Sequence, residues 1–136
     1  MATPPSKDLL YSKTHEWCRV EAGPASGKTA TVGLSAFALQ ALTDLVFLDL
    51  PPVGREVKAG QPFGEIESVK AVSDLYSPVD GQVAAVNAEA AKRLDHLADD
   101  PYGAGWLIKV KITDEAALAD LLDEAAYQKQ CEEEQH

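Results

Sequence analysis

The stretch FGEIESVKAVSDLY (residues 63–76) predicts two short β-strands joined by a tight turn, and this hairpin decides the fold. Residues 63–68 and 71–76 are the two strands. Val69 and Lys70 lie between them, at the expected tip. A lysine at a hairpin tip points away from the core, so an enzyme can approach it from most sides. We expect a modifying enzyme to select Lys70 by the rigid turn and its acidic approach.

Short strand candidates continue on both sides of this hairpin and are separated by turns rich in Gly and Pro. Such close spacing of strands and turns predicts a mainly β fold, a sandwich or a flattened barrel. Residues 17–20 and 29–33 would form a hairpin across a turn at 23–27. The other candidates are 46–50, the short apolar segments within 53–60, 82–86 after a turn at 77–81, and 106–112.

Three helices are predicted around these strands. Ser35 is a suitable N-cap for a short helix over residues 36–42 in the N-terminal half. Residues 88–97 predict a second helix. Thr113 or Asp114 would cap a C-terminal helix, whose apolar stripe is Leu118, Leu121, Leu122 and Ala125.

The chain of 136 residues is expected to form one domain, because 46% hydrophobic residues suffice to close a core. We place a flexible N-terminal arm at residues 1–10, the domain at 11–131 and an acidic C-terminal tail at 132–136. The net charge of −10 repels nucleic acid, and no apolar run is long enough to cross a bilayer. We therefore expect neither a nucleic-acid nor a membrane partner. Cys18 and Cys131 are expected to be free thiols, and one disulfide between them is the alternative.

The sequence shows no catalytic constellation. It contains no Gly-rich phosphate loop, Cys-x-x-Cys or Gly-x-Ser-x-Gly motif, and its three histidines, His15, His96 and His136, lack metal-site spacing. An enzyme is thus the weakest hypothesis. From the residues alone, Lys70 is either a modification site or an ordinary surface lysine.

A resemblance decides between these alternatives. The stretch Glu67-Ser68-Val69-Lys70-Ala71, with Ser73-Asp74 after it, resembles the lipoylation site of the glycine cleavage system H-protein family. Other segments are similar to that family in the same order, from about Tyr11 to Cys131. They include Thr14-His15-Glu16-Trp17, Thr31-Val32-Gly33, Leu50-Pro51, Ser77-Pro78 and Asp100-Pro101-Tyr102-Gly103.

The resemblance implies a lipoyl-domain-like fold and a non-catalytic carrier. Lipoate would be joined to the Lys70 amine, flanked by Glu67, Val69 and Ala71. The carrier would bring the aminomethyl group of glycine from a pyridoxal-phosphate glycine decarboxylase to a tetrahydrofolate-dependent aminomethyltransferase. It would pass electrons to dihydrolipoamide dehydrogenase. A lipoyl or octanoyl transferase would attach the cofactor.

The same resemblance places a cleft for the loaded arm near Thr14, Glu16 and Asp74. Glu16 would accept the ammonium group of the arm, or else it is an ordinary carboxylate at a strand edge. We interpret His15 as a local hydrogen-bonding residue rather than a catalyst.

Two segments depart from the family pattern, Thr43 and the run Leu94–Ala98, and the second leaves the shape of its loop open. Valine and alanine beside Lys70 disfavour a biotinyl domain, and the flanking hairpin and terminal helix disfavour a lipoyl domain of an acyltransferase. An H-like relay that donates lipoate to other enzymes stays an alternative. The Cys131–Glu134 ending resembles plant mitochondrial members, which predicts the mitochondrial matrix after removal of a transit peptide. The alternative location is the bacterial cytoplasm.

Overall fold

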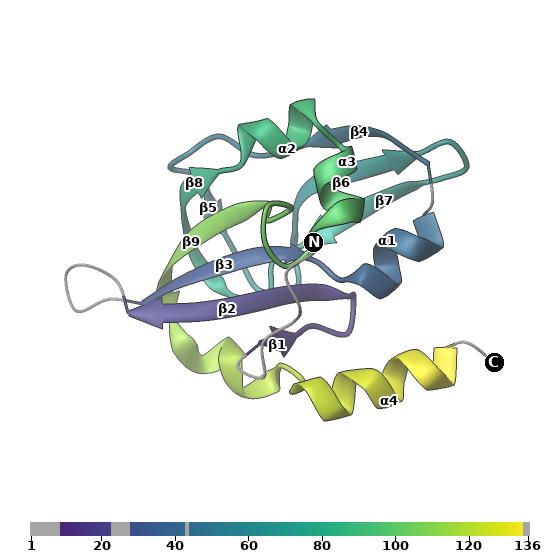
Figure 1. The fold of residues 1–136 in the computed structure, drawn as a ribbon. Helices are drawn as coiled ribbons and strands as arrows, with labels where there is room; N and C mark the ends of the chain where they lie inside the picture. Colours follow the sequence, from purple (N-terminus) through teal and green to yellow (C-terminus); the bar gives the residue numbers. More distant parts are fainter. Residues whose placement is uncertain (1–8, 23–27, 43, 135–136) are drawn as a thin grey trace.

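The computed structural model describes residues 9–22, 28–42 and 44–134, and these form a mainly β protein (Figure 1). Two antiparallel sheets pack against each other, as the sequence predicts for a sandwich. The predicted turn at 23–27 and the departure at Thr43 lie outside the described residues.

The larger sheet has six antiparallel strands. Its central strand β3 pairs with β2 on one side and with β9 on the other. Residues Ala30–Leu34 of β3 are all buried, as expected for a central strand. Across the sheet the strands are β1 (Leu10–Tyr11), β2 (Glu16–Ala22), β3 (Lys28–Leu34), β9 (Ile108–Asp114), β8 (Asp80–Val86) and β5 (Glu56–Val57).

The smaller sheet contains the predicted Lys70 hairpin. Its strands, in order, are β4 (Leu45–Asp49), β6 (Pro62–Ser68) and β7 (Val72–Tyr76). A β-bulge lies between Leu45 and Phe47. The paired residues Leu48 and Ile66 point into the core, while β7 forms an edge of the sheet.

The main core lies between the two sheets. The larger sheet contributes Val32, Val83 and Val110, and the smaller sheet contributes Ile66 and Leu75. Each of these side chains is almost fully buried. Their transfer out of water is the main source of stability of the sandwich.

A second cluster lies on the other side of the larger sheet, beneath the C-terminal helix α4 (Glu124–Glu134). The rings of Tyr11 and Tyr127 are stacked, with centroids 4.2 Å apart. Trp17 is completely buried and donates its indole N–H to the carbonyl of Pro101 at 3.0 Å. A Cβ on Gly33 would lie 2.4 Å from the Trp17 ring, so only glycine fits beside it.

The helices differ in part from the prediction. Helix α1 (Ala36–Leu42) forms as expected, and the amide of Ala38 donates to Ser35 Oγ. The single helix expected over 88–97 is instead two helices, α2 (Ala88–Lys92) and α3 (Asp95–Asp99). The first ends at Arg93, whose φ of −124° is not helical, and whose amide closes on Glu89.

The predicted C-terminal helix is present, but its predicted start at Thr113 or Asp114 is wrong. Strand β9 continues to Asp114, which caps a 3-10 helix, η1 (Glu115–Asp120), rather than an α-helix. Helix α4 begins only after Asp123, whose carboxylate accepts from the amide of Ala126. It buries Tyr127 and not the predicted leucine stripe, since Leu118 and Leu121 pack against the main core before the helix starts.

Two residues of the predicted arm of residues 1–10 belong to the fold, because Leu9 is fully buried and Leu10 lies in β1. Helix α4 extends to Glu134 and thus includes part of the predicted acidic tail. In the segments that the structure describes, no helix is long and apolar enough to cross a membrane.

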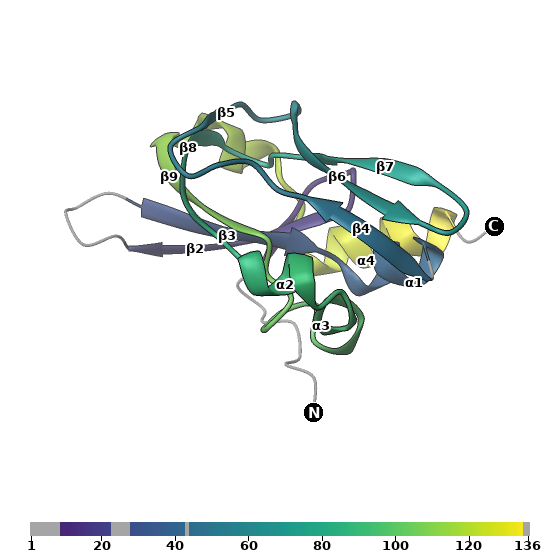
Figure 2. The same cartoon turned by 90° about the horizontal axis from the view of Figure 1, so that it is seen from above.

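Figures 1 and 2 show three segments at the same end of the molecule: helix α1, the tip of the β6–β7 hairpin and the C-terminal end of α4. They are far apart in the sequence. Their meeting at one end positions the candidate site.

Candidate functional site

The tip of the β6–β7 hairpin is held by the side chain of Ser68. Its buried Oγ accepts from the amide of Ala71 at 3.1 Å, and the Ser68 amide donates to the Ala71 carbonyl at 2.8 Å. The amide of Val69 donates to the carbonyl of Asp44, just before β4. The turn is therefore held by hydrogen bonds within the hairpin and by one to the segment before β4.

This pinned turn displays Lys70. Lys70, Val69 and Ala71 are exposed, while Glu67 is half-buried beside them on β6. The structure thus brings Lys70 together with the three residues predicted to flank it, and it leaves the lysine accessible.

A cleft of about 300 Å³ opens directly beside Lys70. Its walls come from the end of β3, helix α1, β6, β7, the turn before β2 and the end of α4. Most of the walls are apolar: Leu34, Phe37, Ala38, Ala41, Leu42, Ile66 and Leu75. The polar lining is Thr14, His15, Glu16, Ser73, Asp74 and Glu134.

Glu16 is the unusual residue of this cleft, because it is a carboxylate residue that is only 1% exposed. Oε1 accepts from Ser12 Oγ at 2.7 Å and from Thr14 Oγ1, and Oε2 accepts from the amide of Tyr76 at 3.2 Å. Burial raises the pKa of Glu16 above its ordinary value, and these hydrogen bonds oppose that shift. Glu16 is therefore not an exposed strand-edge carboxylate.

The other two predicted cleft residues also line it. Thr14 orients the Glu16 carboxylate through its hydroxyl. Asp74 is exposed on the edge strand β7, where it borders the cleft and also a second pocket that Asp49 and Glu65 line. Asp74, far from Thr14 and Glu16 in the sequence, thus meets them in one cleft.

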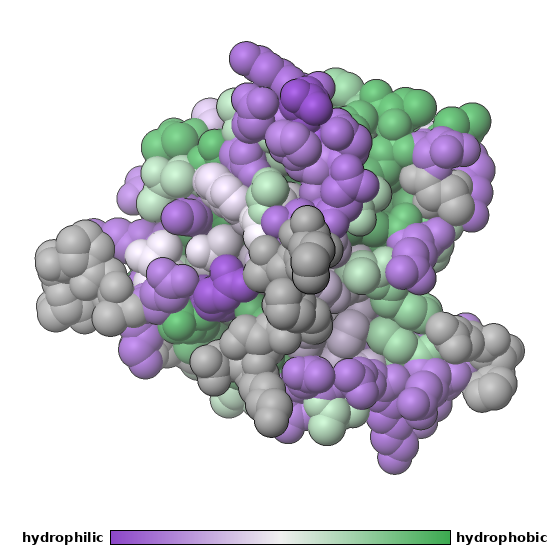
Figure 3. All heavy atoms as spheres, viewed as in Figure 1, coloured by the Kyte–Doolittle hydropathy of each residue, from purple (hydrophilic) through white to green (hydrophobic). Residues whose placement is uncertain are grey.

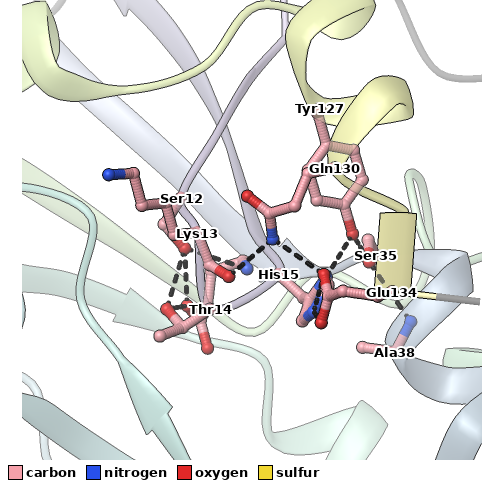
Figure 4. A network of polar contacts seen from close by, with 10 residues as sticks. Ser12, Lys13, Thr14, His15, Ser35, Ala38, Tyr127, Gln130 and Glu134 are labelled. Atoms are coloured by element: carbon pink, nitrogen blue, oxygen red, sulfur yellow. Dashed lines mark hydrogen bonds and ion pairs between the residues drawn. The ribbon is translucent and has the colours of Figure 1, made fainter. Parts of the chain in front are cut away.

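Sequence reasoning missed the contribution of the C-terminal helix (Figure 4). The hydroxyl of Tyr127 pairs with Ser35 Oγ at 2.5 Å and with His15 Nδ1 at 2.7 Å. His15 Nε2 lies 3.2 Å from the Glu134 carboxylate. His15 has a positive φ of 80°, so this network holds the residue before Glu16 in an uncommon conformation. His15 is a local hydrogen-bonding residue, as we had interpreted it.

A second contact attaches α4 to the same turn. The side-chain amide of Gln130 donates to the carbonyl of Lys13 at 2.9 Å and to Glu134 at 2.9 Å. That bond from Gln130 lowers the pKa of the Glu134 carboxyl. The only sequence signal for this arrangement would have been the apolar position of Tyr127 on α4.

The run Leu94–Ala98, which departs from the family pattern, does not reach the Lys70 cleft. Leu94, Asp95 and Ala98 instead line a separate cavity of about 590 Å³, bounded by α1, α3 and the start of β4. Lys70 is not among the residues that line this cavity. The departure therefore leaves the walls of the Lys70 cleft intact.

The described segments contain no group of three His, Cys, Asp or Glu residues arranged to hold a metal ion. Cys18 is buried and Cys131 half-buried, and both thiols are free, as predicted. What the site offers instead is an accessible amine, an apolar cleft and a buried carboxylate.

These residues fit a covalent lipoyl group. The exposed Lys70 amine can form an amide without rearrangement of the turn. The apolar walls suit a hydrocarbon chain with a dithiolane ring, and the Glu16 carboxylate suits a cationic group carried on it.

A two-sheet β protein that presents one lysine on a pinned hairpin tip beside an apolar cleft belongs to the class of small carrier proteins. The particular family follows from comparison with known proteins. The sequence model described as "Glycine cleavage H-protein" matches residues 9–134, and the chain belongs to that family.

Individual relatives agree with this assignment. The chain is 53% identical to the glycine cleavage system H protein of Rhodopirellula baltica over 134 residues, which cover 98% of each chain. It is 49% identical to that of Rubrobacter xylanophilus, over 95% of this chain and 96% of the relative. It superposes on the crystal structure of the Mycobacterium marinum H protein with a TM-score of 0.83 and 42% identity, over 93% of this chain and 98% of the other.

These relatives come from bacteria. The prediction of a mitochondrial protein with a removed transit peptide, which depended on the Cys131–Glu134 ending, gains no support from them.

Proposed function

We propose that this chain is the lipoyl carrier of a glycine cleavage system, with the cofactor joined to Lys70. The observation that carries the proposal is the position of Lys70, exposed on a pinned hairpin tip at the mouth of an apolar cleft. A tether anchored there can swing outward to other proteins or fold back along the cleft.

When bound, lipoate supplies a disulfide that can be opened, loaded and restored by thiol exchange. The chain itself contributes no catalytic group in this proposal. Lys70 anchors the tether, and Glu67, Val69 and Ala71 shape the surface around the amide. Ser68 keeps the turn rigid during attachment and transfer.

Glu16 has the role of holding the cationic end of the cargo. Its buried carboxylate is oriented by Ser12, Thr14 and the Tyr76 amide, so it needs little rearrangement to accept an ammonium group. Asp74 adds negative charge at the rim. The apolar walls exclude water and thereby slow hydrolysis of the cargo.

The partners in this proposal are glycine decarboxylase, aminomethyltransferase, dihydrolipoamide dehydrogenase and the lipoyl or octanoyl transferase. The net charge of −10 favours partners with basic contact surfaces. We place the protein in a bacterial cytoplasm, since the organisms of its relatives are bacterial.

The test is the mass of the intact protein after incubation with a lipoate ligase, ATP and lipoate. Wild type should gain one lipoyl group and Lys70→Arg should gain none. Lys58→Arg, which changes another exposed lysine, is the matched control and should react like wild type. A lipoyl group on Lys70→Arg, or none on wild type, would contradict the proposal.

The carrier role itself is tested with glycine. Lipoylated protein should support release of CO2 from glycine only when glycine decarboxylase is present. Glu16→Ala should be lipoylated normally, yet lose its cargo to water faster than wild type. Equal rates of loss would contradict the protecting role of Glu16.

A further inference from the structure

An apolar patch surrounds the Lys70 hairpin on the side away from the core. The described residues include five exposed large hydrophobic side chains, and four of them gather here: Val46 (55% exposed), Phe47 (50%), Val69 (72%) and Val72 (61%). The fifth, Val53 (64%), lies in the segment after β4. Figure 3 shows apolar surface at the upper right, at the end of the molecule where the hairpin and β4 lie.

The strand register explains why these side chains share a face. Phe47 on β4 pairs with Glu67 on β6, which pairs with Val72 on β7. Paired residues of adjacent strands point to the same side of a sheet. This row therefore crosses the outer face immediately below the Lys70 turn, and Val46 extends it at the bulge.

The next row of the same face is entirely acidic. Asp49 pairs with Glu65, which pairs with Asp74, and all three residues are exposed. These three carboxylates border the patch, and Glu67 adds a fourth within it, between Phe47 and Val72. Isolated exposed apolar residues are common, but an apolar patch with a polar border is typical of a docking surface.

We propose that this face is the docking surface for the enzyme that acylates Lys70, an inference that rests on the proposed function. The enzyme covers the face with an apolar patch of its own, bordered by basic residues. The term hairpin patch denotes the residues of this face: Val46, Phe47, Glu67, Val69 and Val72.

The position of the patch favours this occupant. Acylation joins Lys70 Nζ to the acyl carbon, so the enzyme must contact the residues next to the lysine. The three enzymes that use the finished arm react at its dithiolane end, which the length of the tether separates from Lys70. In the acylation step, the deprotonated amine attacks the acyl carbonyl of an activated donor. The bond to the donor's leaving group breaks, and the amide forms as a proton is released.

Charge also argues against a second copy of this chain as the occupant. Two such faces would bring the carboxylate rows together, and the chain as a whole carries −10. Like charges across an interface oppose association, whereas a basic enzyme surface is attracted.

The experiment measures lipoylation of Phe47→Ser and Val46→Ser by a lipoate ligase, as initial rate against carrier concentration. Both substitutions should lower kcat/KM by about tenfold, mainly through KM, as loss of an apolar contact at an interface centre does. Val53→Ser replaces a valine that is also more than half exposed but lies outside the patch, and it should react like wild type. Thermal melting confirms that all three variants are folded.

The basic residues proposed for the enzyme surface are tested by charge reversal at Glu65 of this chain. Glu65→Lys should lower kcat/KM for lipoylation and weaken its dependence on salt, whereas Glu89→Lys on α2 should do neither. Once fully lipoylated, the Phe47→Ser carrier should support glycine decarboxylation with the KM of wild type.

The outcomes separate the two proposals. If wild type is not lipoylated on Lys70, the proposed function fails. If wild type is lipoylated and Phe47→Ser has an unchanged KM, only the docking surface is overturned. It is also overturned if the lipoylated Phe47→Ser carrier is defective with the decarboxylase, or if wild type is a dimer that Phe47→Ser dissociates.

Discussion

At the scale of single residues, the site depends on two side chains in opposite environments. Lys70 is exposed on its turn, while Glu16 is buried at the start of β2. The exposed amine is open to an enzyme. The buried carboxylate is set by three donors and can bind a cation without first losing a full hydration shell.

Glu16 makes stability depend on pH in a defined direction. Its pKa is about 4.5 in the unfolded chain and is raised in the folded protein by burial. The folded state thus binds more protons between these two pKa values, so stability falls as the pH rises through that window. We expect the free energy of unfolding of wild type, relative to Glu16→Gln, to be highest below pH 4.5 and to decrease above it.

Urea unfolding of both proteins, from about pH 4 to about pH 8, checks this expectation. A difference in unfolding free energy that does not change with pH would contradict it. Thr29→Ser, a change on the opposite end of the larger sheet, serves as a control with the pH dependence of wild type.

At the scale of elements, helix α4 is as important to the site as the hairpin. Through Tyr127, Gln130 and Glu134 it holds the turn before Glu16 and the N-terminal end of α1, which are two walls of the cleft (Figure 4). The cleft is thus assembled from both ends of the chain.

Removing one hydroxyl tests this attachment. Tyr127→Phe should lower the free energy of unfolding by about 1–3 kcal/mol, because the buried Ser35 hydroxyl and His15 Nδ1 lose their shared partner. The stacked ring on Tyr11 is retained. The urea midpoint provides the measurement, and Gln128→Ala, at an exposed position of the same helix, should change it little. A Tyr127→Phe midpoint equal to wild type would show that the hydroxyl network contributes no net stability.

At the scale of the whole molecule, two apolar clusters on either side of the larger sheet close one β-sandwich. Cys18 belongs to the main core, and burial raises the pKa of its thiol to about 12. Cys131 is half-buried on α4. The two thiols therefore report on different parts of the fold.

We expect one thiol, Cys131, to react with a disulfide reagent in the native protein at neutral pH, and both thiols in urea. A buried thiol with a raised pKa supplies little thiolate, so Cys18 should react only when the sandwich unfolds. Mass spectrometry of the labelled peptides distinguishes the two sites. Native labelling of Cys18 as fast as Cys131 would contradict a closed core.

The sequence by itself determined most of the strands, though not β1, because alternation and turn residues act over a few positions. It also placed Val69 and Lys70 at the tip of their hairpin. It also determined helix α1 through the Ser35 cap. The sequence predicted the bounds of the helices less reliably at residues 88–99 and 113–134. Tertiary contacts outweigh weak local helix propensities there.

Only the tertiary structure decided the rest. Glu16 is buried where the end of β7 meets the turn before β2, a turn that helix α4 holds in place, and no pattern within β2 specifies those distant partners. The same holds for the row of Phe47, Glu67 and Val72, which share a face only because the pairing of three strands aligns them. Local periodicity determines which way a side chain points along its own strand, whereas the neighbours it meets depend on how the sheets close.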